Sequence, residues 1–380
     1  MNEAMVYADD FKKSFRAESD FLDFLKNREE ETSWKTEEAN SLRFEAIEEG
    51  SKRLEELSES YSEAGKEDVI KDTLENTKLM LRTGTESIPV RSCAIKTVLE
   101  RAKISGTALS KVERSVFASI LNHCMNVATG KALLKISDDK VSAVHGGDES
   151  DYAVLEMHEL FNRTHDFLND NYSKVTYAGG FFEHSMVTAL WTLDESEELV
   201  EVYKDMLDEN GIRYKEILPS LRLTSSDVGM SGANLYPTLL VDGKNIPLGS
   251  PLKLEHKHGA SLSDFDEKLD MVYSQYDMAL GKLKNLIGII IKYPVNTMIG
   301  VMKKIGIPKK LAMGVVEKFE AVHGVGFCSA HDIYYAIADV IYELQCSGES
   351  GIKVTQMEET VSRALNVRWH DYDIPGIVSW

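Results

Sequence analysis

The feature that most restricts the fold is an alternation of strand pairs with single helices between residues 131 and about 260. Two stretches have the pattern of β-hairpins, with turns predicted at Asp138-Asp139 and at Gly179-Gly180. An amphipathic helix is predicted after each hairpin, and three strand patterns follow in "LPSLRLTSS", "LYPTLLVDGK" and "PLKLEHKH". This order predicts an α+β fold with a central mixed, mostly antiparallel sheet.

The regions on either side of this segment are predicted to be helical. Residues 1–66 carry many acids, few glycines and no proline, which favours a solvated helical arm or a helix that packs on a partner subunit. Disorder in "NREEETSWKTEEAN" is an alternative. We therefore divide the chain into an acidic helical arm (1–66), a helical region (67–130), an α+β core (131–260) and a helical C-terminal region (261–380).

Charge and hydropathy limit the expected partners and location. The formal net charge of −19 disfavours indiscriminate binding to nucleic acid or to anionic membranes, although it permits a local basic patch. The longest apolar run, "LIGIII", is far too short to span a bilayer, and the N-terminus lacks the pattern of a signal peptide. The four cysteines form no CxxC pair, and no glycine-rich phosphate loop is found. We expect a cytoplasmic protein, without a membrane partner or a cofactor.

One segment stands out from this acidic background. Residues 281–316 contain no Asp or Glu, and their helix-turn-helix-like layout is centred on "KKIGIPKK". The segment carries seven lysines: Lys282, Lys284, Lys292, Lys303, Lys304, Lys309 and Lys310. Lysines at such density predict salt-sensitive contacts with nucleic-acid phosphates. The alternatives are a solvated lysine face, which could pair with the acidic arm in an oligomer, and docking on a membrane surface.

Aromatic residues near the glycine pair extend this hypothesis. Tyr177, Phe181 and Phe182 are predicted to lie on the sheet beside the Gly179-Gly180 hairpin. Aromatic rings on a sheet surface are typical stacking platforms for the bases of single-stranded nucleic acid.

Two other groups of residues have the composition of a chemical site. His256 and His258 are spaced at i, i+2, which places both rings on one face of a strand and suits half of a transition-metal site. Asp227, Glu255 and His184 are candidate further ligands, whereas surface histidines at a strand end need no metal. The tripeptide Ser225–Asp227 could place a nucleophile beside a base, but hydroxyl and carboxyl groups in that arrangement are equally typical of a turn.

Three stretches of the chain are "DDKVSAVHGGDESDYAVLEMHELF", "LRLTSSDVGMSGANLYPTLLV" and "EHKHGASLSDFDEKL". They resemble the family named domain of unknown function 932, and the resemblance covers about residues 130–270. The second stretch includes an S-x-V-G-like tetrapeptide at Ser226–Gly229. The family is typical of phages, plasmids and integrated elements, and no reaction is established for it. The resemblance implies a mobile-element protein without conventional catalysis.

These patterns together favour a role in nucleic-acid handling, such as single-strand binding or annealing support in replication or recombination. An acidic protein-interaction module, for instance an inhibitor of a host defence system, is the main alternative. A metal-dependent enzyme at His256 and His258 is a further alternative. We expect a homo-oligomer.

Overall fold

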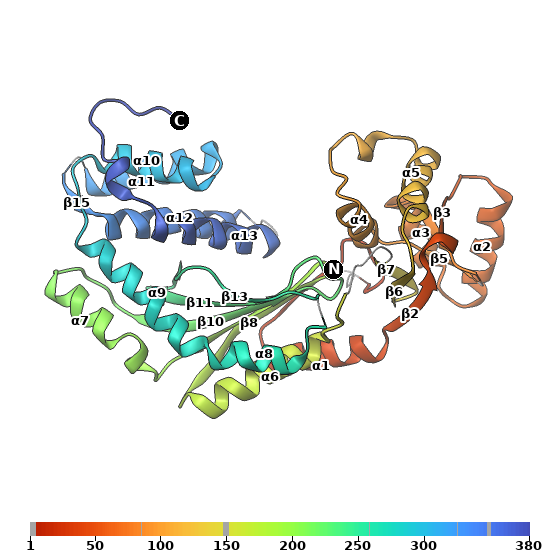
Figure 1. The fold of residues 1–380 in the computed structure, drawn as a ribbon, viewed down its shortest axis with the longest axis horizontal. Helices are drawn as coiled ribbons and strands as arrows, with labels where there is room; N and C mark the ends of the chain where they lie inside the picture. The colour runs from red at the N-terminus through yellow and green to blue at the C-terminus, as the bar shows by residue number, and fades with distance from the viewer. Residues whose placement is uncertain (1–4, 85, 147–151, 258, 325, 348–350) are drawn as a thin grey trace.

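The computed structural model describes residues 5–84, 86–146, 152–257, 259–324, 326–347 and 351–380. It confirms the α+β class and the mostly antiparallel central sheet. The chain forms two lobes, and each lobe has its own hydrophobic core (Figure 1). We call residues 33–146 the small lobe and the other described residues the large lobe.

The small lobe combines two antiparallel three-stranded sheets, with strand orders β2-β6-β7 and β3-β4-β5, and helices that pack on them. Its elements are β2 (Ser33–Glu38), η1 (Ala39–Ser41), β3 (Arg43–Ala46), α2 (Lys52–Glu63), α3 (Glu67–Glu75), β4 (Leu79–Arg82), β5 (Ser87–Pro89), α4 (Ser92–Arg101), η2 (Leu109–Lys111), α5 (Arg114–Asn126), β6 (Lys131–Ser137) and β7 (Lys140–Gly146). The turn between β6 and β7 is at Asp138 and Asp139, as predicted. Both residues have positive φ angles, of 52° and 60°, which suits a tight hairpin.

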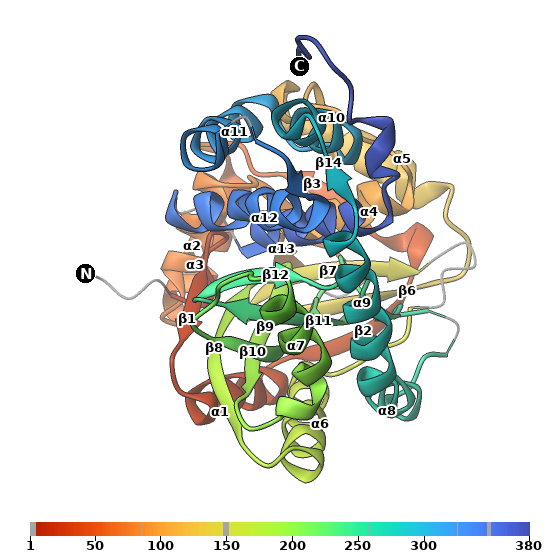
Figure 2. The same ribbon diagram turned by 90° about the vertical axis from the view of Figure 1, so that its left-hand side faces the viewer.

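The large lobe is built on a seven-stranded antiparallel sheet with the order β1-β8-β9-β10-β11-β12, in which β13 also pairs with β11. Its strands are β1 (Lys12–Phe15), β8 (Val175–Glu183), β9 (Met186–Leu193), β10 (Ile217–Ser225), β11 (Ala233–Val241), β12 (Lys244–Pro247) and β13 (Leu252–Leu254). Strand β1 forms one edge, where Lys12 is opposite Glu183 and Phe15 is opposite Gly180 (Figure 2).

Helices cover both faces of this sheet. One face packs against α1 (Glu18–Glu30), α6 (Met157–Asn171), α8 (Leu262–Asp270) and α9 (Val272–Ile287), and the other packs against α12 (Ala330–Cys346) and α13 (Gly351–Ser362). Helices α10 (Pro294–Ile305) and α11 (Lys309–His323) form an outer layer over α12 and α13 (Figures 1 and 2). The remaining elements are η3 (Glu197–Leu199), α7 (Glu201–Glu209), β14 (Ile290–Ile291), β15 (Cys328–Ser329), η4 (Arg363–Asn366) and η5 (Trp369–Asp371).

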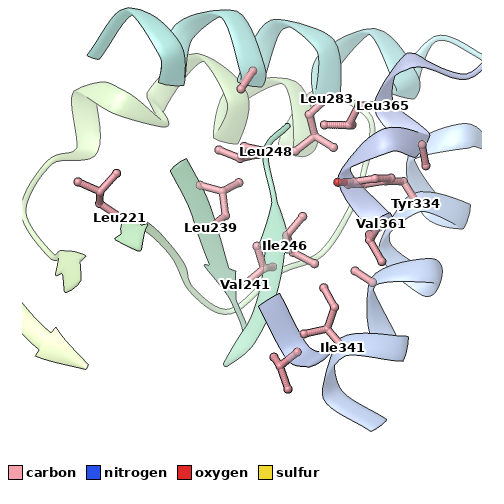
Figure 3. Packing of buried hydrophobic residues seen from close by; sticks show 14 of the residues in the cluster. Leu221, Leu239, Val241, Ile246, Leu248, Leu283, Tyr334, Ile341, Val361 and Leu365 are labelled. Carbon is pink, nitrogen blue, oxygen red and sulfur yellow. The ribbon is translucent and has the colours of Figure 1, made fainter. Parts of the chain in front are cut away.

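Coverage on both faces explains why the central strands contain near-continuous apolar runs. Leu221, Leu239 and Ile246 of the sheet are fully buried, and side chains of α9, α12 and α13 meet the strands from opposite sides (Figure 3). In a core packed this closely, adding or removing a single methylene group changes the stability. The sheet therefore provides a rigid base for the outer helices.

Three predictions about local structure are wrong. Residues 1–66 are not a helical arm, because they supply β1, α1, β2 and β3, and because Phe21 and Phe44 belong to the two cores. In β2, "SWKTEE" is largely exposed and lacks apolar alternation, so its pairing with the distant strand β6 cannot be inferred locally. Strands β6 and β7, expected in the central sheet, instead form a separate three-stranded sheet with β2, in which β6 is the middle strand.

The third correction concerns the glycine pair. Gly179 and Gly180 lie inside β8, where the register shifts, and the turn to β9 is at His184 and Ser185. A Cβ atom on Gly180 would lie 3.2 Å from both the Phe21 ring and the Thr188 carbonyl oxygen. The glycine is therefore needed for close packing of α1 on the sheet and not for a turn.

Candidate functional site

The lysine-rich segment forms an exposed surface around the turn between α10 and α11. Lys303 and Lys304 lie in the last turn of α10, and Lys309 and Lys310 begin α11. All four side chains are exposed, and none forms a hydrogen bond or ion pair with another described residue. Four unpaired cations within eight residues produce a strong local positive potential in an otherwise acidic chain.

The sequence of the turn explains how these lysines come together. Gly306 adopts a left-handed conformation (φ 93°), and the backbone N–H groups of Gly306 and Ile307 both donate to the carbonyl oxygen of Met302, at 3.1 and 3.0 Å. Pro308 then cannot continue a helix and precedes α11. This glycine cap and proline place the lysine pairs on either side of one tight turn.

Electrostatics at the start of α11 argues against a purely structural role. The N-terminus of a helix carries a partial positive charge, so acidic side chains are the stabilising choice there. Helix α11 has no acid in its first turn and has Lys309 and Lys310 in that position. The arrangement weakens the helix and strengthens the positive potential, which an anion would relieve.

Two hollows adjoin this turn. The first, of about 450 Å³, is lined by Lys304, Ile305, Arg363, Asn366, Val367, Arg368, Asp371 and Tyr372. The second, of about 620 Å³, lies between α11, α12 and α13 and includes Lys310, Lys318 and Lys353 among its lining residues. Each hollow has one acid in its lining, Asp371 in the first and Glu343 in the second, and Glu343 pairs with Lys318. Both hollows therefore have a positive lining.

Arg363 and Arg368 extend the cationic surface beyond the predicted segment. Both side chains are exposed, and neither has an ion-pair partner among the residues that the structure describes. We define the basic surface as Lys303, Lys304, Lys309, Lys310, Arg363 and Arg368. The two arginines were missed because they lie far along the sequence among ordinary helical residues, and only the fold brings them beside Lys304.

The other three predicted lysines differ in their placement. Lys282 donates to Asn366, which lines the first hollow, with Nζ 2.9 Å from Oδ1, so it borders the basic surface. Lys284 lies half-buried on α9, and Lys292 is exposed next to β14. Within the described chain, no shared hollow or side-chain hydrogen bond connects Lys284 or Lys292 with the basic surface.

The predicted aromatic platform does not form. Phe182 is fully buried and its ring contacts Phe11 and Phe24. The Tyr177 ring packs against Phe21 and Trp191 within the same core. Alternation along β8 turns Phe181 to the opposite face, which is covered by α13 near Gly351. These rings stabilise the sheet and do not offer a common surface for bases.

Of the histidine and serine candidates, His256 and Ser225 are buried. His258 lies outside the described residues. His256 has both ring nitrogens engaged: Nδ1 lies 3.1 Å from the Ala153 carbonyl oxygen, and Nε2 lies 3.3 Å from Ser225 Oγ. Burial lowers the pKa of His256 to about 4. The Ser225–His256 contact has the form of a nucleophile–base pair, but both side chains are enclosed, so it fastens the end of β10 to the segment that follows β13.

Asp227 belongs to a different feature, which we call the charged junction: Arg28, Arg91, Lys135, Asp138 and Asp227. All five side chains are at least nine-tenths buried where the two lobes meet. The Asp227 carboxylate pairs with Lys135 Nζ at 3.0 Å and with Arg28 Nε at 3.2 Å. Asp138 accepts from Arg28 and from Arg91, both at 2.8 Å. Each acid therefore bridges two cations.

The environment fixes the charge states of the junction. Burial alone would raise the pKa of Asp227, but Lys135 and Arg28 outweigh it and hold the pKa below its usual value. Burial, together with the charges of Arg91 and Arg28, lowers the pKa of the adjacent His184 to about 2, so this ring is neutral. The charges of the junction are paired, although Asp227 Oδ1 and Arg91 Nε have no hydrogen-bond partner among the described residues. Its two cations and its burial tie Asp227 to a structural role.

Arg28 and Arg91 were not predicted as special residues. A signal for Arg28 is present in the sequence, because Phe21, Leu25 and Arg28 fall on one face of α1 at i, i+4 and i+7. A charged residue on an apolar face indicates a buried partner. Arg91 precedes α4 and has no comparable signal.

Comparisons with models of known protein families, with characterised proteins and with solved structures found no match. Among the described residues, no helix is both long enough and apolar enough to cross a membrane. The chemistry of the basic surface therefore provides the argument about function.

Proposed function

We propose that the chain binds single-stranded nucleic acid through the basic surface, in a role such as single-strand binding or annealing support during replication or recombination. The observation that carries the proposal is the concentration of exposed, unpaired lysines and arginines on one helical layer of a chain with a formal net charge of −19. Lysine supplies a point charge and arginine a fork that matches phosphate oxygens. Both would act on the backbone, so little sequence preference is expected.

The shape of the surface favours a flexible strand as the ligand. The two hollows lie on either side of the α10–α11 turn, and a single strand can bend to follow both. Tyr293, at the end of α10 opposite Lys303 and Lys304, is 40% exposed and offers a ring on which a base of a longer strand can stack. The aromatic side chains of β8 cannot stack on bases because they are packed inside the protein. We also propose that the chain belongs to the family of domain of unknown function 932 and acts in a mobile element.

Salt-dependent binding tests the proposal. Fluorescence anisotropy with labelled oligonucleotides, single-stranded and duplex, would be measured over a series of KCl concentrations. We expect the logarithm of the binding constant for the single strand to fall linearly with the logarithm of the salt concentration. Lys309→Ala with Lys310→Ala should reduce that slope by about 1.4, since each phosphate contact to a single strand contributes about 0.7.

The matched control removes two exposed lysines elsewhere, Lys26 on α1 and Lys215 before β10. Replacing both with alanine changes the net charge by the same amount and should leave the slope unchanged. No binding at the lowest ionic strength would refute the proposal. An equal loss of slope in the control would assign the binding to net charge and would also refute it.

A further inference from the structure

Three side chains of different chemistry converge beside the outer helical layer, away from the basic surface and the charged junction. His323 ends α11, Cys328 lies in β15, and Asp332 lies in the first turn of α12. A ring nitrogen of His323, Cys328 Sγ and a carboxylate oxygen of Asp332 lie within 4.8 Å of one another. Among the described residues, this is the only such grouping of three potential metal ligands.

Each of the three side chains is held in place by contacts with neighbouring residues. Asp332 forms a capping box: its Oδ2 accepts from the backbone N–H and the hydroxyl of Ser329, both at 2.8 Å. The other carboxylate oxygen, Oδ1, stays available. Cys328 is fixed by the pairing of β15 with β14, opposite Ile291. The His323 ring stacks on Phe319, with centroids 4.9 Å apart.

An unpartnered ring nitrogen of His323 is a second observation at this group. Its Nδ1 is enclosed and has no hydrogen-bond partner among the described residues. An enclosed polar atom without a partner is costly, because it has lost its contact with water and gained nothing in return. A cation bound by all three groups would satisfy it.

We propose that His323, Cys328 and Asp332 bind a Zn²⁺ ion. Thiolate, imidazole and carboxylate are the ligands that zinc takes in proteins, and hard cations such as Mg²⁺ avoid sulfur. In a tetrahedral zinc site the ligand atoms are about 3.3–3.8 Å apart, so the group must contract by about 1 Å. Three protein ligands leave a fourth position for water or for an external ligand.

Proton release accompanies binding at this site. The thiolate is the form of Cys328 that binds metal, so binding displaces the thiol proton. Affinity is therefore expected to increase with pH. The site joins α11, β15 and α12, so bound metal also raises the melting temperature of the whole chain.

Titration of the purified full-length chain with Co²⁺, a spectroscopic substitute for Zn²⁺, tests the proposal. We expect one equivalent to produce the near-ultraviolet thiolate-to-cobalt absorption and the visible bands of a tetrahedral site, and Zn²⁺ to displace both. Cys328→Ser should abolish the thiolate band. His323→Gln, at a partly exposed position, should weaken Co²⁺ binding by more than about 100-fold while the chain stays folded.

The control is Cys346→Ser, which removes an exposed cysteine and should leave the spectrum unchanged. A wild-type chain that gives no thiolate band would overturn the proposal. The same conclusion would follow if the band persisted in Cys328→Ser, or if His323→Gln bound Co²⁺ as tightly as the wild type. If Cys328→Ser does not fold, the His323→Gln affinity decides the question.

Discussion

At the scale of single residues, the charged junction shows how costly it is to remove one partner of a buried ion pair. Asp227→Asn would leave Lys135 and Arg28 enclosed with less negative charge, and we expect a loss of about 3–5 kcal/mol in the free energy of unfolding. Urea denaturation followed by circular dichroism measures this loss.

A matched substitution at an exposed ion pair provides the control. Asp266 pairs with Arg163, and both side chains are more than a third exposed. Asp266→Asn should cost less than about 1 kcal/mol, because solvent screens the pair. Similar losses for Asp227→Asn and Asp266→Asn would show that the junction is not the tightly coupled network described above.

Two buried histidines make stability depend on pH. Burial lowers the pKa values of His145 and His256 to about 4, so the folded state keeps both rings neutral while the unfolded chain accepts protons near pH 6.5. Their contribution is complete above pH 6.5 and is lost as the pH falls towards 4. We expect each to reduce the free energy of unfolding by about 2 kcal/mol between pH 8 and pH 5.

Denaturation of histidine variants at several pH values separates this effect from a general loss of stability. His256→Gln should reduce the difference in unfolding free energy between pH 8 and pH 5 by that amount, whatever its cost at pH 8. His123→Gln, at an exposed position, should leave the difference unchanged. Glu29 changes the free energy of unfolding in the opposite direction, because burial and nearby acids raise its pKa to about 7 and its contribution is lost as the pH rises. An unaltered pH profile in His256→Gln would contradict the assignment.

At the scale of elements, a glycine in α10, Gly300, lets the ring of Tyr372 in the C-terminal segment pack closely against the helix. A Cβ atom on Gly300 would lie 2.6 Å from the Tyr372 ring, too close for the ring to stay in place. Gly300→Ala should therefore displace Tyr372, which also lines the first hollow, and lower the melting temperature by several degrees.

A double-mutant cycle identifies the cause. In a Tyr372→Ala background the clash with the ring is absent and only the contact with the Cβ atom of residue 372, at 3.1 Å, remains. Gly300→Ala should therefore cost much less there than in the wild type. Calorimetry of the four proteins gives the coupling between the two positions. Additive effects would mean that Tyr372 is not the residue displaced.

Elements were predictable from the sequence where local chemistry decides them. The Asp138-Asp139 turn was predicted correctly, because turn preferences act over a few residues. The polar strand β2 and the glycine pair in β8 were misassigned. Their conformations depend on contacts with β6 and with Phe21, which lie far away in the sequence.

At the scale of the whole molecule, the two hydrophobic cores meet at the charged junction. Asp138 contacts both Arg28 of the large lobe and Arg91 of the small lobe. Asp138→Asn keeps a residue that tolerates the positive φ angle but removes the charge. We expect calorimetry to change from one unfolding transition in the wild type to two, because the lobes lose the Arg28–Asp138 ion pair and keep only Lys135–Asp227 at the junction.

Asp139 lies in the same turn with a similar backbone conformation, and its carboxylate pairs with Lys66 at the surface. Asp139→Asn is therefore a matched control and should keep a single transition. Two transitions in this control, or one in Asp138→Asn, would contradict a coupling role for the junction.

The candidate site was predictable in part at this scale. The clustering of Lys303, Lys304, Lys309 and Lys310 follows from adjacency in the sequence and one turn. Arg363 and Arg368 join them only through the packing of η4 and η5 beside α10, and the hydrophobic contacts that bring them there carry no local signal. Burial of Phe182 likewise depends on α1, which was expected to be solvated.

The pairing of β1 with β8 has a consequence for the newly made chain. Strand β1 leaves the ribosome before the small lobe, and β8 leaves after it. Synthesis proceeds at about 5–20 residues per second, so β1 and the phenylalanines of α1 remain without their partners in the large lobe for on the order of 10 s. The small lobe, whose strands all lie within residues 33–146, can close during that interval. Translation speed through this segment thus sets how long the unpaired edge is open to chaperones or to aggregation.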